Sequence, residues 1–132
     1  MRLWQKQTQY YLMSKILIVE DDAVLQQMYQ DQFVYEGFQV AVAADGGEGL
    51  TQMRTFQPDA VVLDLMLPTM TGFDVIDTVK NDPELSKIPI LVLTNIFADG
   101  EDLVKNKGVK SFMLKSNTTP GEVVKKVRSL IQ

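Results

Sequence analysis

Polar side chains that could carry chemistry follow the short apolar runs of this sequence. The positions after these runs hold, in chain order, Glu20, Asp21, Asp22, Asp64, Thr94 and Lys115. Each has an ordinary interpretation when taken singly: Asp22 suits a helix N-cap, and a lone Lys115 suits a solvated surface. Together, the carboxylates, the hydroxyl and the ammonium are groups that bind hard cations and phosphoryl oxygens.

Asp64 is the hardest of these residues to explain as a purely structural one. It lies between apolar residues on both sides, where a lone carboxylate is costly to desolvate. Placing Glu20 and Asp21 beside it adds repulsion, because two like charges about 4 Å apart repel by about 4 kcal/mol at an effective dielectric of 20. Such a cluster favours a proton or a divalent cation. Oxygen-only ligands predict Mg²⁺, with Mn²⁺ and Ca²⁺ as alternatives.

A phosphoryl group is the second ligand that this combination suits. Mg²⁺ typically uses one or two carboxylates and leaves positions for a phosphoryl oxygen. Lys115 and the hydroxyl of Thr94 could hold the other oxygens. Asp64 itself could act as the nucleophile, because a carboxylate can form an aspartyl-phosphate.

Composition narrows the other possibilities. The chain has 132 residues, which suits one domain, residues 15–132, and a short Gln-rich N-terminal extension, residues 1–14. The absence of Cys and His excludes disulfides, thiolate or His-ligated metal sites and a Ser-His-Asp triad. The net charge of −4 argues against a direct nucleic-acid partner. No apolar run has the length of a membrane span or of a signal-peptide core, so we expect a cytoplasmic protein with no membrane partner.

The elements that must position these side chains alternate regularly along the chain. The expected strands are residues 16–19, 38–43, 60–63, 88–93 and 109–114, and the expected helices are residues 23–36, 47–56, 73–81, 99–107 and a last helix capped by Thr119. This alternation predicts an α/β fold, a doubly wound parallel five-stranded sheet with helices on both faces. Ligands of such sheets bind beyond the carboxyl ends of the strands, where the polar side chains are expected.

Four segments of the chain resemble the receiver domain of two-component response regulators. They are residues 16–22, 61–72, 88–94 and 112–115, and the resemblance extends over about residues 15–132. It implies a flavodoxin-like (βα)5 fold with strand order 2-1-3-4-5. It also implies a phosphoacceptor switch rather than an enzyme, one that catalyses only its own phosphorylation and dephosphorylation.

The resemblance also implies roles for individual residues. Asp64 resembles the phosphoacceptor, and the metal ligands would be Glu20, Asp21, Asp64 and the backbone carbonyl of Met66, with Mg²⁺ as the cofactor and Mn²⁺ as an alternative. Thr94 resembles the switch hydroxyl and Lys115 the lysine that pairs with the phosphoryl group. Phe112 resembles the aromatic residue whose rotamer reports activation.

The partners that the resemblance implies are a sensor histidine kinase and an output surface at about residues 99–132. That surface would bind an unknown output protein or a second copy of the chain. Two positions depart from the family pattern: Ser116 follows Lys115 where Pro is usual, and Asn95 follows Thr94 where a small residue is usual.

These departures support an alternative, a receiver-like module that interacts with partners without being phosphorylated. A small Mg²⁺-dependent phosphohydrolase is a further alternative, but Met66 stands where such an enzyme would use a second carboxylate. A flavin-binding module is disfavoured because no Ser/Thr/Gly-rich loop follows the first strand.

Overall fold

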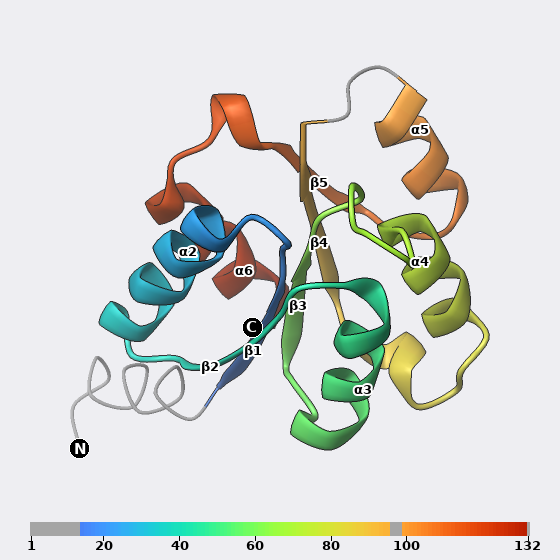
Figure 1. The fold of residues 1–132 in the computed structure, drawn as a ribbon, viewed down its shortest axis with the longest axis horizontal. Coiled ribbons are helices and arrows are strands. Elements are labelled where there is room, and N and C mark those ends of the chain that lie inside the picture. The colour runs from blue at the N-terminus through green and yellow to red at the C-terminus, as the bar shows by residue number, and fades with distance from the viewer. Residues whose placement is uncertain (1–13, 96–98, 132) are drawn as a thin grey trace.

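The computed structural model describes residues 14–95 and 99–131, and it contains one parallel sheet (Figure 1). Its strands are β1 (Lys15–Val19), β2 (Gln39–Ala43), β3 (Ala60–Leu63), β4 (Ile90–Thr94) and β5 (Ser111–Leu114). Their order is β2-β1-β3-β4-β5, with every neighbouring pair parallel. This is the predicted flavodoxin-like order.

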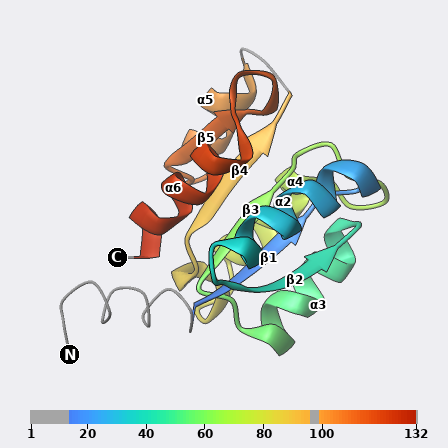
Figure 2. The ribbon, with the colours of Figure 1, turned by 90° about the vertical axis from the view of Figure 1, so that its left-hand side faces the viewer.

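Helices cover both faces of the sheet. They are α2 (Ala23–Tyr35), α3 (Gly46–Phe56), α4 (Gly72–Lys80), α5 (Asp99–Asn106) and α6 (Pro120–Ile131), with short 3₁₀ turns η1 (Leu85–Lys87) and η2 (Lys115–Asn117). Helices α2 and α6 lie together on one face, and α3, α4 and α5 lie on the other (Figures 1 and 2). Within the described ranges, no helix is long and apolar enough to cross a membrane.

The continuous apolar run of β1 is explained by burial on both of its faces. Ile16 and Ile18 pack into the cluster beneath α2 and α6, whereas Leu17 and Val19 pack into the cluster beneath α3, α4 and α5. Successive side chains of a strand point to opposite faces, so a two-sided core requires apolar residues at every position. Full burial of each such side chain contributes about 1.5–3 kcal/mol.

The predicted helix N-caps at Asp22 and Thr119 are confirmed. Asp22 Oδ1 accepts hydrogen bonds from the backbone N–H groups of Val24 and Leu25, each at 3.0 Å. At the start of α6, Thr119 Oγ1 accepts from the N–H of Glu122 at 3.2 Å, and Glu122 Oε1 accepts from the N–H of Thr119 at 3.1 Å. This reciprocal pair satisfies two backbone donors that the helix itself leaves free.

Three strands begin later than the apolar pattern predicted: β2 by one residue, and β4 and β5 by two residues each. Ile88 is not part of β4, because its N–H closes the η1 turn on the carbonyl of Leu85 at 3.0 Å. Val109 is not part of β5, because its N–H bonds to the carbonyl of Val104 at 3.0 Å at the end of α5. Thr94 is the last residue of β4 rather than the residue after it.

Residues 1–13 of the expected N-terminal extension lie outside the described residues. Ser14, which the composition placed in that extension, belongs structurally to the domain. It is buried, and its carbonyl accepts a hydrogen bond from the N–H of Gln39 at 3.0 Å.

Gly72 fixes how closely α4 approaches the end of β3. A Cβ at this position would lie 2.3 Å from the carbonyl oxygen of Asp64 and 2.7 Å from Cα of Leu65. Both are backbone atoms and cannot rotate away. Only glycine therefore allows α4 to begin directly against the backbone that carries Asp64.

We expect Gly72→Ala to lower the free energy of unfolding by about 1–3 kcal/mol or more, because the added methyl group overpacks against rigid backbone. The matched control is Gly121→Ala in α6, where a Cβ meets nothing within 4 Å. That change is expected to stabilise the protein by up to about 1 kcal/mol through helix propensity. Urea denaturation of the three proteins measures both effects, and equal shifts in the two variants would contradict the role of Gly72.

Candidate functional site

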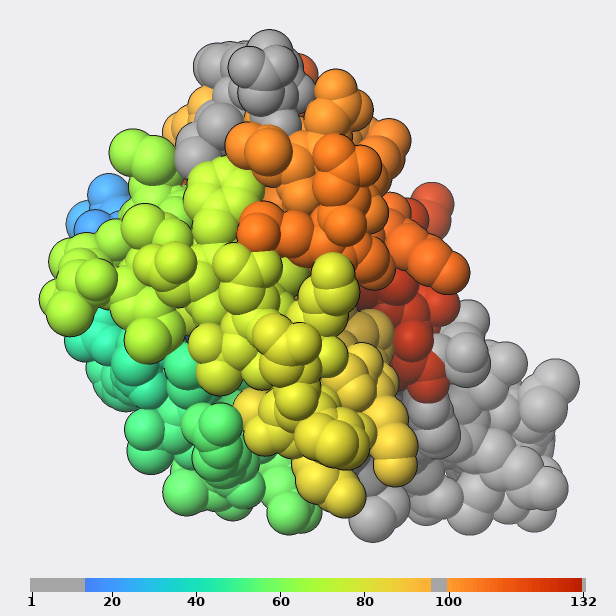
Figure 3. All heavy atoms as spheres, turned by 90° about the vertical axis from the view of Figure 1, so that its right-hand side faces the viewer, coloured from blue at the N-terminus to red at the C-terminus, as the bar shows by residue number. Residues whose placement is uncertain are grey.

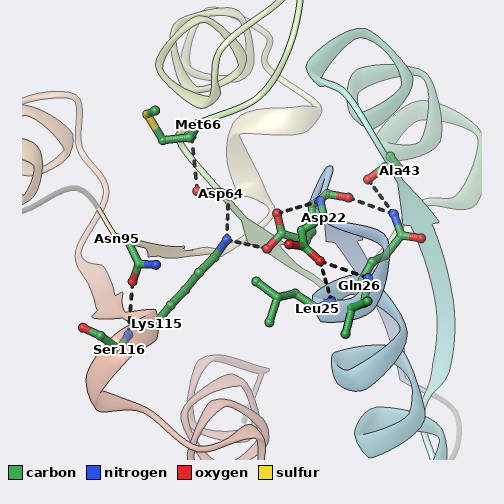
Figure 4. A network of polar contacts seen from close by, with 11 residues as sticks. Asp22, Leu25, Gln26, Ala43, Asp64, Met66, Asn95, Lys115 and Ser116 are labelled. Atoms are coloured by element: carbon green, nitrogen blue, oxygen red, sulfur yellow. Dashed lines mark hydrogen bonds and ion pairs between the residues drawn. The ribbon is translucent and has the colours of Figure 1, made fainter.

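Three strands deliver the central side chains to the carboxyl edge of the sheet. Glu20 follows β1, Asp64 follows β3 and Lys115 follows β5. Lys115 Nζ donates hydrogen bonds to Glu20 Oε1 and, at 2.7 Å, to Asp64 Oδ2 (Figure 4). The side chains of Lys115, Glu20 and Asp64 are only 11%, 3% and 5% exposed, respectively. This is a buried, ion-paired network, the kind whose disruption leaves an uncompensated charge.

Sheet hydrogen bonds hold the backbone beneath this network. The N–H of Glu20 donates to the carbonyl of Ala43 at 2.9 Å, and the N–H of Asp64 donates to the carbonyl of Val19 at 3.0 Å. From α2, Gln26 Nε2 donates to the carbonyls of Glu20 at 2.9 Å and Ala43 at 3.2 Å (Figure 4). The sequence analysis did not identify Gln26. Its position one helical turn after the Asp22 cap could have indicated that it lies near the end of β1.

The acidic residues form a group that could hold a cation. One carboxylate oxygen from each of Glu20, Asp21 and Asp64 lies within 4.8 Å of the others. Asp21 is exposed, whereas Glu20 and Asp64 are buried. Three carboxylates against the one ammonium of Lys115 leave an excess of negative charge, and oxygen donors of this kind suit Mg²⁺.

Burial and charge shift the pKa values within the network. Burial, aided by the charge of Asp64, raises the pKa of Glu20 to about 7 in spite of the hydrogen bond from Lys115. Burial also acts to lower the pKa of Lys115, but the hydrogen bonds and charges of Asp64 and Glu20 outweigh it and raise that pKa above its ordinary value. Lys115 therefore stays protonated throughout the physiological range.

The other sequence-predicted residues surround this centre. Thr94 is fully buried at the end of β4, the neighbour of β3. Met66 is 64% exposed, and its N–H donates to Asp64 Oδ1 at 3.2 Å. Phe112, on β5, is half-buried and packs against the core cluster beneath α3, α4 and α5.

The two departures from the family pattern contact each other. Asn95 Oδ1 accepts a hydrogen bond from the N–H of Ser116 at 3.1 Å, which ties the end of β4 to the turn that carries Lys115 (Figure 4). A proline after Lys115 would have no N–H to donate. Asn95 and Ser116 are thus complementary, and their pairing was not evident from two separate positions in the sequence.

Tyr29 is a second residue that sequence reasoning missed. It is a buried side chain of α2 that borders a small cavity together with Glu20, Asp64 and Lys115. Burial raises the pKa of its phenol, so the hydroxyl stays neutral beside the charged network. It lies within the helix expected at residues 23–36, but the sequence did not single it out.

A flavodoxin-like sheet with a buried lysine and paired carboxylates at its carboxyl edge defines the class of protein. Residues 16–128 match the family described as the response regulator receiver domain. The chain therefore belongs to the receiver domain family of two-component response regulators. Receiver domains are signalling switches rather than classical enzymes.

Individual relatives agree with this assignment. MtrA of Mycobacterium tuberculosis, described as a DNA-binding response regulator, is 39% identical over 120 residues, which cover 89% of this chain and 50% of MtrA. TcrX of the same species, described as a probable transcriptional regulatory protein, is 33% identical over 127 residues, with 89% and 49% covered. The chain thus spans about half the length of the curated relatives it matches.

Solved structures match over the whole fold. The chemotaxis response regulator CheY4 of Vibrio cholerae has a TM-score of 0.81 at 28% identity, covering 89% of this chain and 98% of that one. A response regulator from Chloroflexus aurantiacus has a TM-score of 0.82 at 28% identity, with 89% and 97% covered.

The raised pKa of Glu20 predicts how stability depends on pH when no divalent cation is present. Between the ordinary value of 4.5 and about 7, the folded protein holds a proton that the unfolded chain has lost. The free energy of unfolding should therefore fall as pH rises through this window, by about 1–3 kcal/mol. Lys115 adds no pH dependence here, because it is protonated in both states.

Urea denaturation in EDTA at about pH 5 and about pH 8 measures this contribution, with Glu20→Gln as the comparison. The variant carries no titrating group at this position, so the difference in stability between the two proteins should change with pH in the stated direction. A difference that stays constant, or that changes in the opposite direction, would show that the folded protein does not raise the pKa of Glu20.

Proposed function

We propose that this domain accepts a phosphoryl group on Asp64 from a phosphohistidine of a sensor histidine kinase. A carboxylate oxygen of Asp64 attacks phosphorus while the P–N bond of the donor breaks, and its electron pair leaves with the imidazole nitrogen. The observation that supports this proposal is the hydrogen bond from Lys115 to Asp64 at 2.7 Å. With Ser116 in place of the usual Pro, Lys115 still reaches Asp64, which supports this role for Lys115.

Mg²⁺, or Mn²⁺ in its place, would offset the negative charge that the phosphoryl oxygens bring to the site. The residues that would hold it are Glu20, Asp21, Asp64 and the backbone carbonyl of Met66. The closeness of the three carboxylates supports this assignment. A cation also relieves their mutual repulsion, because it supplies the positive charge that Lys115 alone does not.

Lys115 and Thr94 would respond to the transferred group. The ammonium of Lys115 would exchange its bond with Asp64 for one with a phosphoryl oxygen, which is a charge-assisted contact of similar strength. The hydroxyl of Thr94 would move toward another oxygen. Phe112 would then settle inward, since its ring already packs against the core and carries no hydroxyl to satisfy.

The signal would leave through α5, β5 and α6, within residues 99–132. Exposed charged residues of this surface include Asp102, Lys105, Lys110, Lys125 and Lys126. An output protein or a second copy of the chain would bind there. The alternative, a module that signals without phosphate, loses its main support because Asn95 and Ser116 leave Lys115 in contact with Asp64.

Incubation with acetyl phosphate and Mg²⁺ tests the acceptor role. The intact mass of the wild-type protein should rise by one phosphoryl group, and Asp64→Asn should show no gain. Asp102→Asn, which removes an exposed carboxylate of α5, is the matched control and should be phosphorylated like the wild type. Phosphorylation of Asp64→Asn would refute the acceptor assignment, and an unmodified wild type that also fails to bind Mg²⁺ would favour the alternative module.

Mg²⁺ alone should stabilise the folded protein. At a tenfold excess over its dissociation constant, a ligand that binds only the folded state adds about 1.4 kcal/mol to the free energy of unfolding. Asp21→Asn should abolish this gain, because it removes a carboxylate of the cluster while leaving the buried pair with Lys115 intact. Denaturation with Mg²⁺ or EDTA measures the effect, with Asp31→Asn on α2 as the control; an unchanged gain in Asp21→Asn would exclude this residue as a ligand.

A further inference from the structure

A second concave surface lies at the opposite end of the sheet from Asp64. It is a groove of about 380 Å³ between the end of α4, the segment that leads into β4, the end of α5 and the start of β5. We call it the basic groove. Its lining includes Ile90 and Ser111, the first residues of β4 and β5, whereas Asp64 and Lys115 lie beyond the other ends of the strands.

The charged side chains that line the basic groove are lysines. Among the described residues, four lysines line it, and no Asp or Glu does. They are Lys80, Lys87, Lys107 and Lys110. Lys107 binds Asp77 at 2.6 Å, but within residues 14–95 and 99–131 the other three make no ion pair. This separation of charge is unexpected on a chain with a net charge of −4.

The floor of the groove is apolar and recessed. Ile76, Val79 and Val109 line it, and they are only 2%, 4% and 8% exposed. In Figure 3 the orange atoms of α5 and the yellow atoms after α4 flank this region, with the dark red end of α6 set back behind them. Leu130 of α6 also contributes to the lining.

We propose that the basic groove binds an acidic amphipathic segment of a partner protein. Its apolar side chains would enter the floor, and its carboxylates would face the lysines of the rim. Charge complementarity favours this occupant. The lysines of the rim would pair with carboxylates, and the apolar floor would contact an apolar stripe on the same segment. A flat bilayer or a nucleic-acid duplex would meet the lysines but could not reach a recessed floor.

This site is independent of phosphoryl transfer, because it shares no residue with the acidic cluster and lies at the other edge of the sheet. It shares Lys110 with the proposed output surface but also includes α4 and the segment before β4. Its test therefore succeeds or fails separately from the test of Asp64.

Titration of the ¹⁵N-labelled protein with a synthetic peptide tests the proposal. The probe is a short peptide with leucines at helix spacing i, i+3 and i+4 and glutamates at the other positions. We expect saturable binding with a dissociation constant of about 10–100 μM, with amide shifts concentrated at Lys80, Lys87 and residues 107–111. The same peptide with glutamine for glutamate should bind at least roughly tenfold more weakly.

Charge reversal at the rim supplies the matched variants. Lys80→Glu with Lys110→Glu should weaken peptide binding by roughly tenfold or more, whereas Lys125→Glu with Lys126→Glu on α6 changes the net charge equally and should have little effect. All four lysines are exposed, so both variants should remain folded, which circular dichroism checks.

Several results would overturn the proposal. These are the absence of saturable binding, equal binding of the glutamine peptide, equal losses in the two double variants, or shifts that lie outside the groove. Tighter binding of decanoate, of anionic vesicles or of duplex DNA at the same residues would assign the groove to a different occupant. Self-association through these residues in sedimentation would assign it to a second copy of the chain.

Discussion

The ammonium of Lys115 between Glu20 and Asp64 is the interaction on which the site depends. Two carboxylates at the edge of an apolar sheet would repel each other and would be poorly solvated, so neither could remain charged there without a nearby cation. Lys115 supplies one positive charge, which is too little for three carboxylates. The resulting excess of negative charge leaves the centre able to take up a divalent cation, and with it a phosphoryl group. Stability and reactivity therefore arise from the same incomplete neutralisation.

The sheet topology makes this contact possible. Glu20 and Lys115 are 95 positions apart in the chain, and Asp64 lies between them. All five strands run in the same direction, so every strand exit lies at one edge, and right-handed crossovers alone suffice to gather the three residues. The tight start of α4 against the Asp64 backbone, permitted by Gly72, then limits how far the loop after β3 can move.

The apolar runs and the polar residues that follow them were enough to predict the sheet, its two helical layers and the clustering of Glu20, Asp21, Asp64 and Lys115. The strand order came from the resemblance, because periodicity describes each strand but not its neighbours; the structure confirms it. The starts of β4 and β5 were wrong, since Ile88 and Val109 are apolar yet close turns with their N–H groups. The Asn95–Ser116 bond and the basic groove were not predicted. Each is formed by residues from segments far apart in the sequence, and a local sequence pattern does not indicate which segments come into contact.

The two ends of the sheet carry opposite charge, and the fold keeps them apart. A five-residue strand such as β4 spans about 16 Å, which exceeds the Debye length of about 8 Å at physiological ionic strength. The acidic cluster and the lysine rim therefore neutralise each other little. The acidic cluster can still attract a cation, and the lysine rim can still attract an acidic segment. Any communication between them must pass through packing instead. The elements that could carry it are β4 and β5, which extend from the groove to Thr94 and Lys115. Because these strands are buried and closely packed, a shift at one end of either strand would displace residues at the other end.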